Sequence, residues 1–304
     1  MADAPSVVAI VVNWRLAEAT LHCLADLRAC GVPGLEVAVI DNGSDDGSVE
    51  RLRAGAPHAT LIALPENSGY CAAVNRGLRH ARERGARHAL LLNNDLRLAP
   101  GFLPPLVEVL DNDPSVAGVM PTVLGPDGRV WSCGGDLRFG PNLVALRHQG
   151  AAPPPRTLGP QLVGFLPGAC ALYRLADLAA VGDLDEAYWM YMEDADLGLR
   201  LRRLGRKLLW IPWVHAVHVP GSSSGGARSP LRKFLMGANE IRLLRAHGTA
   251  RLWLAFLLCD LLAAPLALLG GAPRGGVAKL RGILAGIRGR RLDAAALAGL
   301  LARA

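Results

Sequence analysis

The sequence lacks the cysteine patterns of a metal-binding or disulfide-rich secreted protein. It has six cysteines in 304 residues, and none forms a Cys-x-x-Cys pair or another metal-ligand spacing. We therefore interpret them as buried thiols of a protein in a reducing compartment, with the cytosol as the expected location. The six are Cys23, Cys30, Cys71, Cys133, Cys170 and Cys259.

The sequence also lacks a recognisable signal peptide. The apolar run at residues 7–12 has no basic region before it, and Asn13-Trp14-Arg15 follows at once. The run is too short for a signal and predicts a strand. Aromatic residues make up only 5% of the chain, but 51% of it is hydrophobic. This composition supports an ordinary globular core and excludes intrinsic disorder.

Acidic residues are scarce at the C-terminal end. Residues 1–220 carry 20 basic and 23 acidic side chains, whereas residues 221–304 carry 13 and 3, so the net charge changes from −3 to +10. A DNA-binding protein usually spreads its basic footprint over a folded reading surface, and no nucleic-acid-binding motif is present. A basic and apolar C-terminal segment instead predicts contact with an anionic membrane surface.

The first 120 residues alternate β-branched apolar runs with amphipathic stretches, which is typical of a parallel sheet with helices between its strands. Polar residues follow the second and fourth runs, at the strand ends where ligands bind in open α/β sheets. We expect strands at 7–12, 35–40, 60–63 and 88–92, followed in turn by helices at 16–30, 48–53, 72–84 and 102–110.

The second half of the chain has a weaker pattern. Gly and Pro dominate between Pro121 and Pro160, which predicts a loop-rich excursion. Apolar residues at helical spacing predict a helix at 193–204 that Gly205 closes. We expect a mobile loop at 221–226, where glycine and serine dominate, and further helices at 231–247, 251–269 and 277–288.

Two loops could contact a nucleotide. Asp41 begins the string Asp-Asn-Gly-Ser-Asp-Asp-Gly, which either forms a helix-capping turn or lets Asp41 accept a hydrogen bond from the imide N–H of uracil or thymine. Glu66-Asn67-Ser68-Gly69, with Asn75 after it, lies between an expected strand and helix. Backbone N–H groups there could face a pyrophosphate, and a plain capped loop is the alternative.

Asn93-Asn94-Asp95 directly follows the fourth expected strand. A carboxylate at a buried strand end is poorly solvated unless a cation lies beside it. Mg²⁺ in proteins binds one or two carboxylates together with substrate phosphates. The segment therefore predicts a divalent metal site beside a diphosphate, and a capped turn explains it equally well.

Glu193, Asp194 and Asp196 lie at the start of an expected helix. The helix dipole favours acids there by about 0.3–1 kcal/mol each, which is a sufficient structural explanation. The aromatic and Met-rich stretch at 188–192 is typical of a pocket floor, where desolvation makes a carboxylate a better base. His215 and His218 lie in an apolar run, where a structural histidine is the more common interpretation.

Taken in order, these motifs resemble those of the inverting family 2 glycosyltransferases, and most of all the bacterial rhamnosyltransferase-like branch. The resemblance covers roughly residues 6–245, and the order and spacing of the motifs carry it. The motifs are Val11-Val12-Asn13, Asp41-Asn42-Gly43-Ser44, Glu66-Asn67-Ser68-Gly69, Asn93-Asn94-Asp95, and the segments 165–169, 185–196 and 218–222.

The resemblance implies a GT-A fold, an α/β architecture in which a Rossmann-like nucleotide-binding half and an acceptor half share one continuous mixed sheet. It implies that Asp95 and His218 bind Mg²⁺ or Mn²⁺, and that Asp194, next to Glu193, is the catalytic base. Asn93 replaces the first Asp of the family's D-x-D signature. The implied substrate-binding residues are Asn13, Asp41, which reads the pyrimidine base, Asn42, Glu66, Asn67, Gly69, Asn75, Asn93 and Asn94.

The expected function is inverting transfer of a sugar, rhamnose from dTDP-rhamnose, to a hydroxyl of a lipid-linked or cell-surface glycan. Residues 1–247 would form the catalytic domain and residues 248–304 a helical membrane-associating appendage. A UDP-hexose-dependent enzyme of the same fold and a catalytically inactive sugar-nucleotide-binding protein are the alternatives. A nucleotidyltransferase is disfavoured because the loop after the first expected strand has no Gly- and Lys/Arg-rich phosphate motif.

Residues 252–271 form an apolar run of 20 residues, interrupted only by Asp260, that is long enough to cross a bilayer. A spanning helix would bury Asp260 at about 2.5–3.5 kcal/mol, and equally basic flanks give it no orientation. A buried helix of a soluble domain leaves Asp260 and Pro265 unexplained. We therefore expect a monotopic, peripheral arrangement, with this helix and residues 277–288 in the cytoplasmic interface.

Overall fold

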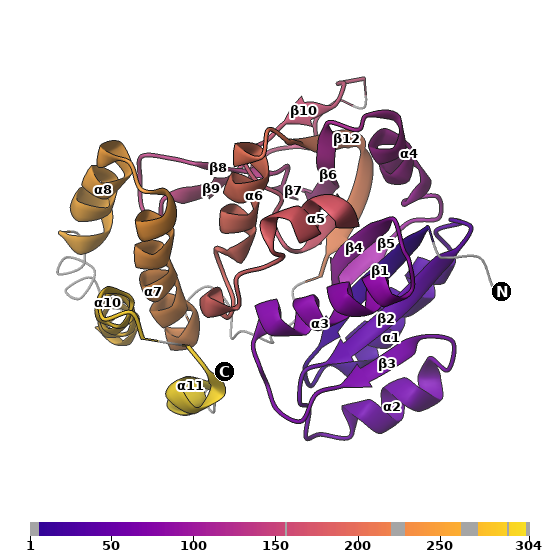
Figure 1. The fold of residues 1–304 in the computed structure, drawn as a ribbon, viewed down its shortest axis with the longest axis horizontal. Coiled ribbons are helices and arrows are strands. Elements are labelled where there is room, and N and C mark those ends of the chain that lie inside the picture. Colours follow the sequence, from indigo (N-terminus) through magenta and orange to yellow (C-terminus); the bar gives the residue numbers. More distant parts are fainter. Residues whose placement is uncertain (1–5, 156, 220–228, 263–272, 291, 302–304) are drawn as a thin grey trace.

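One mixed sheet forms the centre of the computed structural model, which describes residues 6–155, 157–219, 229–262, 273–290 and 292–301 (Figure 1). Ten strands belong to this sheet. The strand order is β10-β12-β6-β11-β4-β1-β2-β3, with β5 paired to β12 and β7 paired to β6. The expected continuous mixed sheet is therefore confirmed.

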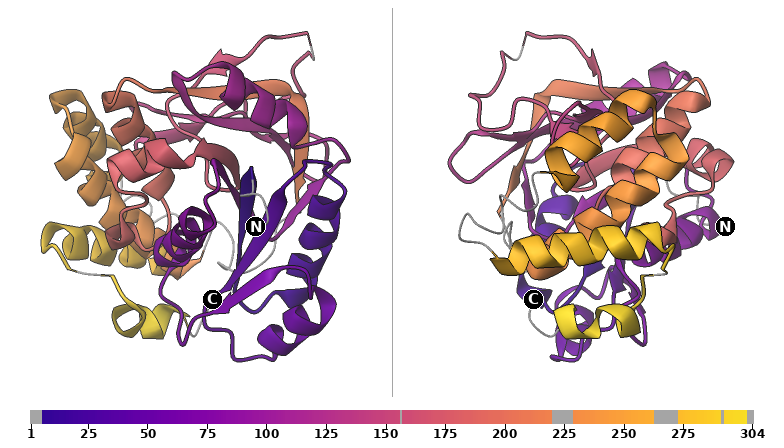
Figure 2. Two further views of the ribbon diagram at one scale, coloured as in Figure 1. Left: turned by 45° about the vertical axis from the view of Figure 1, so that its right-hand side comes forward. Right: turned by 90° about the vertical axis from the view of Figure 1, so that its left-hand side faces the viewer.

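The N-terminal half is the expected parallel unit. Its strands β1 (Val7–Asn13), β2 (Leu35–Asp41), β3 (Thr60–Ala63) and β4 (His88–Asn93) pair in parallel. The apolar residues of β1 and β4 and the second half of β2 are buried because helices cover both faces, α3 on one and α1 and α2 on the other (Figure 2), whereas β3 at the edge of the sheet is partly exposed. These helices are α1 (Ala17–Arg28), α2 (Ser48–Gly55) and α3 (Tyr70–Glu83).

The second half extends the sheet with β6 (Val116–Leu124), β11 (Cys170–Arg174) and β12 (Lys207–His218). β11 lies antiparallel to both β4 and β6 and so joins the two halves. The region expected to be only loops also contains short strands, whose pairing with distant segments the local pattern does not show. They are β7 (Val130–Ser132), β8 (Gly135–Leu137), β9 (Val144–Leu146) and β10 (Gln161–Leu162).

The remaining helices cover the second half and the C-terminal end. The helix predicted at 251–269 differs from expectation, because it changes to a π-helix after Phe256. The segment 263–272 and the glycine-serine stretch 221–226 lie outside the described residues. The elements are α4 (Pro104–Asn112), α5 (Leu175–Val181), η1 (Glu186–Tyr188), α6 (Glu193–Arg203), α7 (Pro230–His247), α8 (Ala250–Phe256), η2 (Leu257–Leu261), α10 (Pro273–Ile287) and α11 (Ala294–Leu301).

Asp260 has partners that the sequence did not reveal. The side chain is 4% exposed and accepts a hydrogen bond of 3.0 Å from the backbone N–H of Asn142. It also forms an ion pair with Lys279 of α10. The expectation that a protein-buried helix leaves Asp260 unexplained is therefore wrong. Within the described ranges, no helix is both long and apolar enough to cross a membrane.

The cysteines are unpaired, as expected from their spacing. Five of the six are buried and Cys259 is half-buried. Burial raises the pKa of the Cys30 and Cys133 thiols to about 11, so both are protonated and unreactive at neutral pH.

Candidate active site

The carboxyl ends of β1, β2 and β4 lie side by side. In the sheet register Asn13 pairs with Asp41, and Val12 pairs with Asn93. This register brings three of the predicted polar segments to one edge because parallel strands end together. The three strand ends therefore lie together, and their role as one site stays a prediction.

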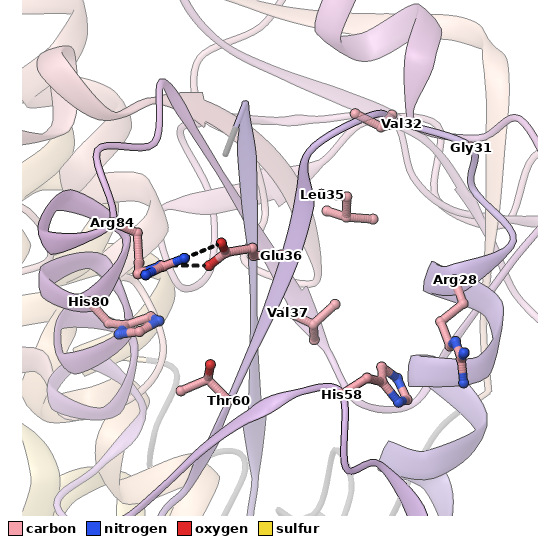
Figure 3. Close-up of a pocket in the computed structure, with 10 residues that line it drawn as sticks. All are labelled: Arg28, Gly31, Val32, Leu35, Glu36, Val37, His58, Thr60, His80 and Arg84. Carbon is pink, nitrogen blue, oxygen red and sulfur yellow. Dashed lines mark hydrogen bonds and ion pairs between the residues drawn. The ribbon is translucent and has the colours of Figure 1, made fainter. Parts of the chain in front are cut away.

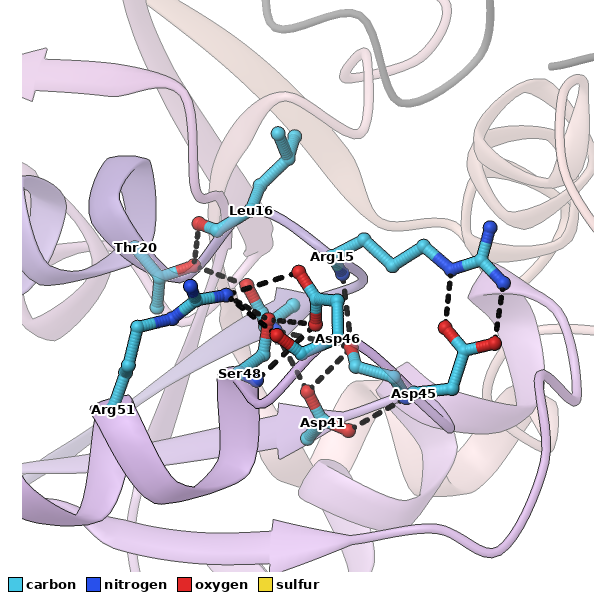
Figure 4. A network of polar contacts seen from close by, with 10 residues as sticks. Arg15, Leu16, Thr20, Asp41, Asp45, Asp46, Ser48 and Arg51 are labelled. Carbon is cyan, nitrogen blue, oxygen red and sulfur yellow. Dashed lines mark hydrogen bonds and ion pairs between the residues drawn. The ribbon is translucent and has the colours of Figure 1, made fainter.

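Asp41 is fully buried and hydrogen-bonded within the protein (Figure 4). Its Oδ2 accepts hydrogen bonds from Nδ2 of Asn13 at 2.7 Å and from the hydroxyl of Ser44 at 2.8 Å. Its Oδ1 accepts one from the backbone N–H of Ser44 at 2.9 Å. A base could therefore reach this carboxylate only after the Asp41–Ser44 turn moves.

A buried polar chain extends from Asp41 into the next element. The Thr20 hydroxyl donates to Oδ1 of Asn13 at 2.7 Å and accepts from Nδ2 of Asn94 at 2.9 Å. Asn13 and Asn94 are both buried. Their amide groups therefore fix the relative positions of the β1 and β4 ends. Thr20 belongs to none of the sequence motifs, so nothing in the sequence pointed to it, whereas Ser44 ends the Asp41-Asn42-Gly43-Ser44 motif without a role of its own being expected.

Asn42 holds the predicted pyrophosphate loop. Its Oδ1 accepts from the backbone N–H and hydroxyl of Ser68, both at 3.0 Å, and its Nδ2 donates to Oδ1 of Asn67 at 3.1 Å. Gly69 has φ +87° and its Cα faces the ring of Trp189, where a Cβ would lie 2.7 Å from the indole. Glycine is therefore required here both for the backbone angle and for space.

Two other residues of the predicted binding set are placed differently. Glu66 is exposed on the loop. Asn75 lies one turn into α3, where its Nδ2 donates to the carbonyl of Leu184 at 2.9 Å and its Oδ1 accepts from the Leu184 N–H at 3.2 Å. Asn75 thus connects α3 to the segment before η1. Both polar atoms of its amide are already hydrogen-bonded to the Leu184 backbone.

Arg15 contacts the loop that follows β2, close to Asp41. Its guanidinium makes two hydrogen bonds of 2.8 Å to the Asp45 carboxylate and lies 4.9 Å from the centre of the Trp14 ring (Figure 4). Its backbone N–H donates to the Ser44 hydroxyl at 2.9 Å. These contacts tie the loop after β1 to the loop after β2.

Asp95 and His218 meet although they lie far apart in the sequence. Antiparallel pairing of β5 (Leu96–Leu98) with β12 places His218 opposite Leu96. Nε2 of His218 then lies 3.1 Å from Oδ1 of Asp95, and each side chain is 12% exposed. The Trp131 ring packs at 4.8 Å from the imidazole centre. His215 instead contacts the Pro212 carbonyl at 3.1 Å and is not part of this pair.

The Asp95–His218 pair fits a divalent cation. Two ligand atoms at right angles around an ion with bonds of about 2.1 Å are about 3 Å apart, which matches the observed 3.1 Å. Carboxylate and imidazole together suit Mn²⁺, and carboxylate with phosphate suits Mg²⁺. Among the described residues, no group of three or more His, Cys, Asp or Glu side chains could hold a metal.

Glu193 and Asp194 lie at the start of α6 in different environments. Glu193 is 6% exposed, and its Oε2 has no hydrogen-bond partner among the described residues. Asp194 is half-buried; its Oδ2 accepts from the backbone N–H of Gly168 at 3.2 Å and its Oδ1 from that of Ala195 at 2.8 Å.

The two carboxyl groups differ in acidity. Burial, together with the neighbouring Asp194 charge, raises the pKa of Glu193 well above its usual value. Burial also raises the pKa of Asp194, but the backbone N–H groups of Ala195 and Gly168 limit the rise to about 6. With a pKa of about 6, Asp194 is mostly ionised at neutral pH yet basic enough to accept a proton, whereas burial raises the pKa of Glu193 well above its usual value.

A short chain of contacts connects the base candidate to the strand ends. The backbone N–H of Asn93 donates to the carbonyl of Ala169 at 2.9 Å, and the adjacent Gly168 donates to Asp194. The hydroxyl of Tyr70 donates to the Gly168 carbonyl at 2.9 Å. Gly168 therefore connects the Asn93–Asp95 segment, the start of α3 and the start of α6.

A separate cavity of about 670 Å³ lies at the other end of the N-terminal strands (Figure 3). It is lined by the first residues of β2, by Arg28 at the end of α1, and by His80 and Arg84 at the end of α3. Basic residues at helix C-termini complement the helix dipoles. This cavity is distinct from the strand ends that carry the predicted site.

Comparison with known proteins shows the family to which the chain belongs. The model of glycosyl transferase family 2 matches residues 6–182. The N-acetylglucosaminyl-diphospho-decaprenol L-rhamnosyltransferase of Mycobacterium tuberculosis (strain ATCC 25618 / H37Rv) is 29% identical over 226 residues, which cover 66% of this chain and 72% of the relative. Rhamnosyltransferase WbbL of Escherichia coli K12 is 40% identical over 57 residues, 19% of this chain and 22% of the relative.

Two solved structures share the fold. GalNAc-T7 with UDP, GalNAc and Mn²⁺ superposes with a TM-score of 0.60 at 13% identity, covering 93% of this chain and 54% of that chain. Mannosyltransferase PcManGT of Pyrobaculum calidifontis with GDP-Man and Mn²⁺ gives 0.57 at 19%, covering 94% and 88%. The fold is therefore GT-A, as expected. Since the family model covers more than half of the chain, the protein belongs to glycosyl transferase family 2 and is a glycosyltransferase.

Proposed function

We propose that the protein transfers a sugar from a nucleoside diphosphate donor to an acceptor hydroxyl with inversion, and that Asp194 is the general base. The observation that carries this proposal is the difference between the adjacent carboxyl groups. Glu193 is buried, with no hydrogen-bond partner for its Oε2 among the described residues, whereas Asp194 is partly exposed, accepts two backbone N–H groups and has a pKa of about 6. An acceptor hydroxyl is a weak nucleophile, and a base near the operating pH is the most effective remedy.

In this mechanism Asp194 removes the hydroxyl proton while the oxygen attacks the anomeric carbon opposite the diphosphate. The bond to the diphosphate oxygen breaks in the same displacement, so no covalent enzyme intermediate forms. The Gly168 N–H, which donates to Asp194 Oδ2 at 3.2 Å, holds the carboxylate in place.

The donor site comprises the carboxyl ends of β1, β2 and β4 with the 66–69 loop. Asn42, Asn67 and Gly69 shape that loop, and its backbone would face the diphosphate. Asn13 and Asn94 position the strand ends. Direct contact of Asn93, Glu66 and Asn75 with the donor stays a prediction. For Asp41 we propose base recognition through the turn that it holds, because its own carboxylate is enclosed.

Asp95 and His218 would hold Mg²⁺ or Mn²⁺. When bound, such an ion stabilises negative charge on the departing diphosphate. Asp95 follows Asn93 and Asn94 in the link between β4 and β5, and His218 is the last residue of β12, which pairs with β5. Asn93 has an uncharged amide in place of the first carboxylate of the D-x-D signature, and an amide binds a cation less strongly. The affinity of the protein for the ion would therefore depend on the donor phosphates.

For the donor we propose dTDP-rhamnose, with UDP-hexose as the alternative. The support is the relatives in Mycobacterium tuberculosis and Escherichia coli, which are both named rhamnosyltransferases. The first relative's name specifies a diphospho-decaprenol acceptor, and we propose a lipid-linked glycan acceptor here as well. A catalytically inactive nucleotide-binding protein is disfavoured because Asp95, Asp194 and His218 are all in place.

A lipid-linked acceptor requires access to a membrane, and we propose that the C-terminal helices provide it. Of the fourteen large hydrophobic side chains exposed among the described residues, eight lie on α8, η2 and α10, and a ninth, Leu262, directly follows η2. We call them the apolar end: Trp253, Leu254, Leu257, Leu258, Leu261, Leu262, Val277, Leu284 and Ile287. These helices form one end of the molecule (Figure 1).

The apolar end also carries positive charge. On α10 the exposed residues Arg274, Val277, Arg281, Leu284 and Arg288 follow one another at intervals of three and four, so basic and apolar side chains alternate along one face. An interfacial helix buries its apolar side chains while its arginines reach the headgroups. We therefore propose a catalytic domain at 1–247 and an appendage at 248–304. The appendage would attach the protein peripherally to the cytoplasmic face of the membrane.

A panel of sugar nucleotides tests the proposed donor class. Thermal unfolding of the protein is measured with Mn²⁺ and each of several dTDP, UDP and GDP sugars. A ligand at about 100 times its dissociation constant stabilises a folded protein by about 2.7 kcal/mol, which is a clear shift in Tm. We expect the largest shift with dTDP-rhamnose. No shift with any dTDP or UDP sugar would contradict the proposed donor class.

A further inference from the structure

The turn that leads into the Glu193-Asp194 pair has an unusual backbone. Trp189, Tyr191 and Met192 adopt left-handed φ angles of 64°, 72° and 67°. Side chains larger than that of glycine rarely adopt these angles, and such residues persist only where the surroundings hold them. Residues 188–192 therefore need an external restraint to deliver Asp194 to its place.

Asn239 provides such a restraint. It lies in the middle of α7 and is 0% exposed. Its Nδ2 donates to the carbonyl oxygens of Tyr188 at 2.9 Å, Met190 at 2.9 Å and Tyr191 at 2.8 Å. One side-chain amide thus binds three carbonyl groups of one turn, and its Oδ1 accepts from Arg242 Nη1 at 2.8 Å, which fixes the orientation of the amide.

The fourth carbonyl of the turn connects to the donor side of the protein. The Trp189 carbonyl accepts from the backbone N–H of Cys71, at the start of α3, at 3.2 Å. The Trp189 ring lies against Gly69, where even a Cβ would not fit. The turn is therefore held between the proposed diphosphate loop and α7.

α7 is itself closely packed on its other side. A Cβ at Gly237 would lie 2.5 Å from the Lys279 carbonyl of α10, and one at Gly286 would lie 2.7 Å from the Ala238 carbonyl. Such close approach of two helix backbones leaves little freedom to shift α7. Asn239 thus projects from a firmly held helix.

We propose that Asn239 is a positioning residue for the general base: by binding the carbonyls of residues 188, 190 and 191 it keeps the strained turn in the conformation that sets Asp194 against Gly168. This inference rests on the proposed role of Asp194. It assigns Asn239 no contact with substrate. Asn239 could not be recognised from the sequence, since a single Asn in an amphipathic helix belongs to no motif.

The test compares Asn239→Ala with Leu244→Ala, another buried residue of α7 that packs into a separate apolar cluster. Both variants should lower Tm. Only Asn239→Ala should lower kcat, by about tenfold or more, while the dissociation constant for the nucleotide sugar changes less than threefold. The acid limb of the kcat profile should also shift, because a displaced Asp194 changes both its burial, which raises its pKa, and its hydrogen bond from Gly168, which lowers it.

Equal kcat losses in Asn239→Ala and Leu244→Ala, or an unchanged acid limb, would overturn the proposal and leave Asn239 a purely structural residue. If Asn239→Ala does not fold, Asn239→Ser, which keeps one donor, replaces it and should show the same changes at smaller size. Asp194→Asn is measured in parallel. If that variant stays active, the base assignment itself fails; if it is inactive and Asn239→Ala is unimpaired, only the positioning role fails.

Discussion

The backbone N–H of Gly168 donates a hydrogen bond of 3.2 Å to Oδ2 of Asp194. Gly168 immediately precedes the carbonyl of Ala169, which accepts from Asn93 at the end of β4. A single backbone segment therefore contacts both the start of α6 and the strand end that leads to Asp95. This arrangement is the structural basis for placing the acceptor and donor chemistry in one site.

Asp194→Asn should reduce transfer by at least about a hundredfold, because general-base assistance is typically worth about 10²–10⁴ in rate. Donor affinity should change little, since the amide keeps the size of the side chain and Asp194 does not contact the donor in this mechanism. Steady-state kinetics and nucleotide-sugar titration measure the two quantities. Glu193→Gln is the matched control. An active Asp194→Asn enzyme beside an inactive Glu193→Gln enzyme would reverse the assignment.

Transfer by the parent enzyme should rise with pH through about 6, because only the ionised Asp194 accepts a proton and burial raises its pKa to about 6. The kcat profile measured between pH 4.5 and 8 checks this. A profile that is flat across this interval would show that no group of this acidity is needed.

The same raised pKa has a consequence for stability. The folded protein holds the Asp194 proton more tightly than the unfolded chain does, so ionising Asp194 costs folding free energy. This cost develops between the unfolded pKa near 4 and the folded pKa near 6, and it is constant above that. The Tm of Asp194→Asn minus that of the parent should therefore increase from pH 4 to 6 and then level off. A difference independent of pH would contradict the raised pKa.

Asp95→Ala and His218→Ala should both weaken Mn²⁺-dependent donor binding, by at least about tenfold, or 1.4 kcal/mol. The reason is that the two side chains lie 3.1 Å apart and would share one ion. Titration of the nucleotide sugar with and without Mn²⁺ measures the effect. His215→Ala is the control, because its ring contacts the Pro212 carbonyl instead. Full activity of the parent enzyme in EDTA would contradict the proposed role of a divalent cation.

Leu258→Glu and Arg281→Glu should each reduce binding to vesicles that contain anionic lipid. Leu258 belongs to the apolar end, and each basic residue near an anionic surface is worth about 1 kcal/mol. Point substitutions are preferable to truncation, because removing α10 would uncover the buried face of α7. Leu204→Glu, an exposed leucine outside the apolar end, is the control. If binding of the parent protein to vesicles does not depend on the lipid charge or on the salt concentration, the membrane proposal is refuted.

Local patterns in the sequence were sufficient for the N-terminal half of the fold. The four strands of the parallel unit and the helices between them follow from buried apolar runs and amphipathic stretches, and the observed bounds of β3 are those expected. The polar residues after β2 and β4 were informative because parallel strands end at a common edge.

Pairing between distant segments was not predictable in the same way. The motif resemblance implied that Asp95 and His218 belong together, but it is the β5–β12 pairing that brings them into contact. Asp260 lies 118 residues from Asn142, whose backbone N–H it binds, so no local pattern could show that its charge is compensated. The enclosure of Asp41 depends on Ser44 and Asn13, and a turn-forming string does not reveal which way its carboxylate points.

The most direct test of the account is the anomeric configuration of the product. The donor that gives the largest thermal shift is incubated with the protein, Mn²⁺ and a lipid-linked glycan acceptor, and the new linkage is analysed by NMR. A single displacement assisted by Asp194 predicts a product whose anomeric configuration is opposite to that of the donor, formed by the parent enzyme and absent with Asp194→Asn. A product with the donor's own configuration would contradict the account.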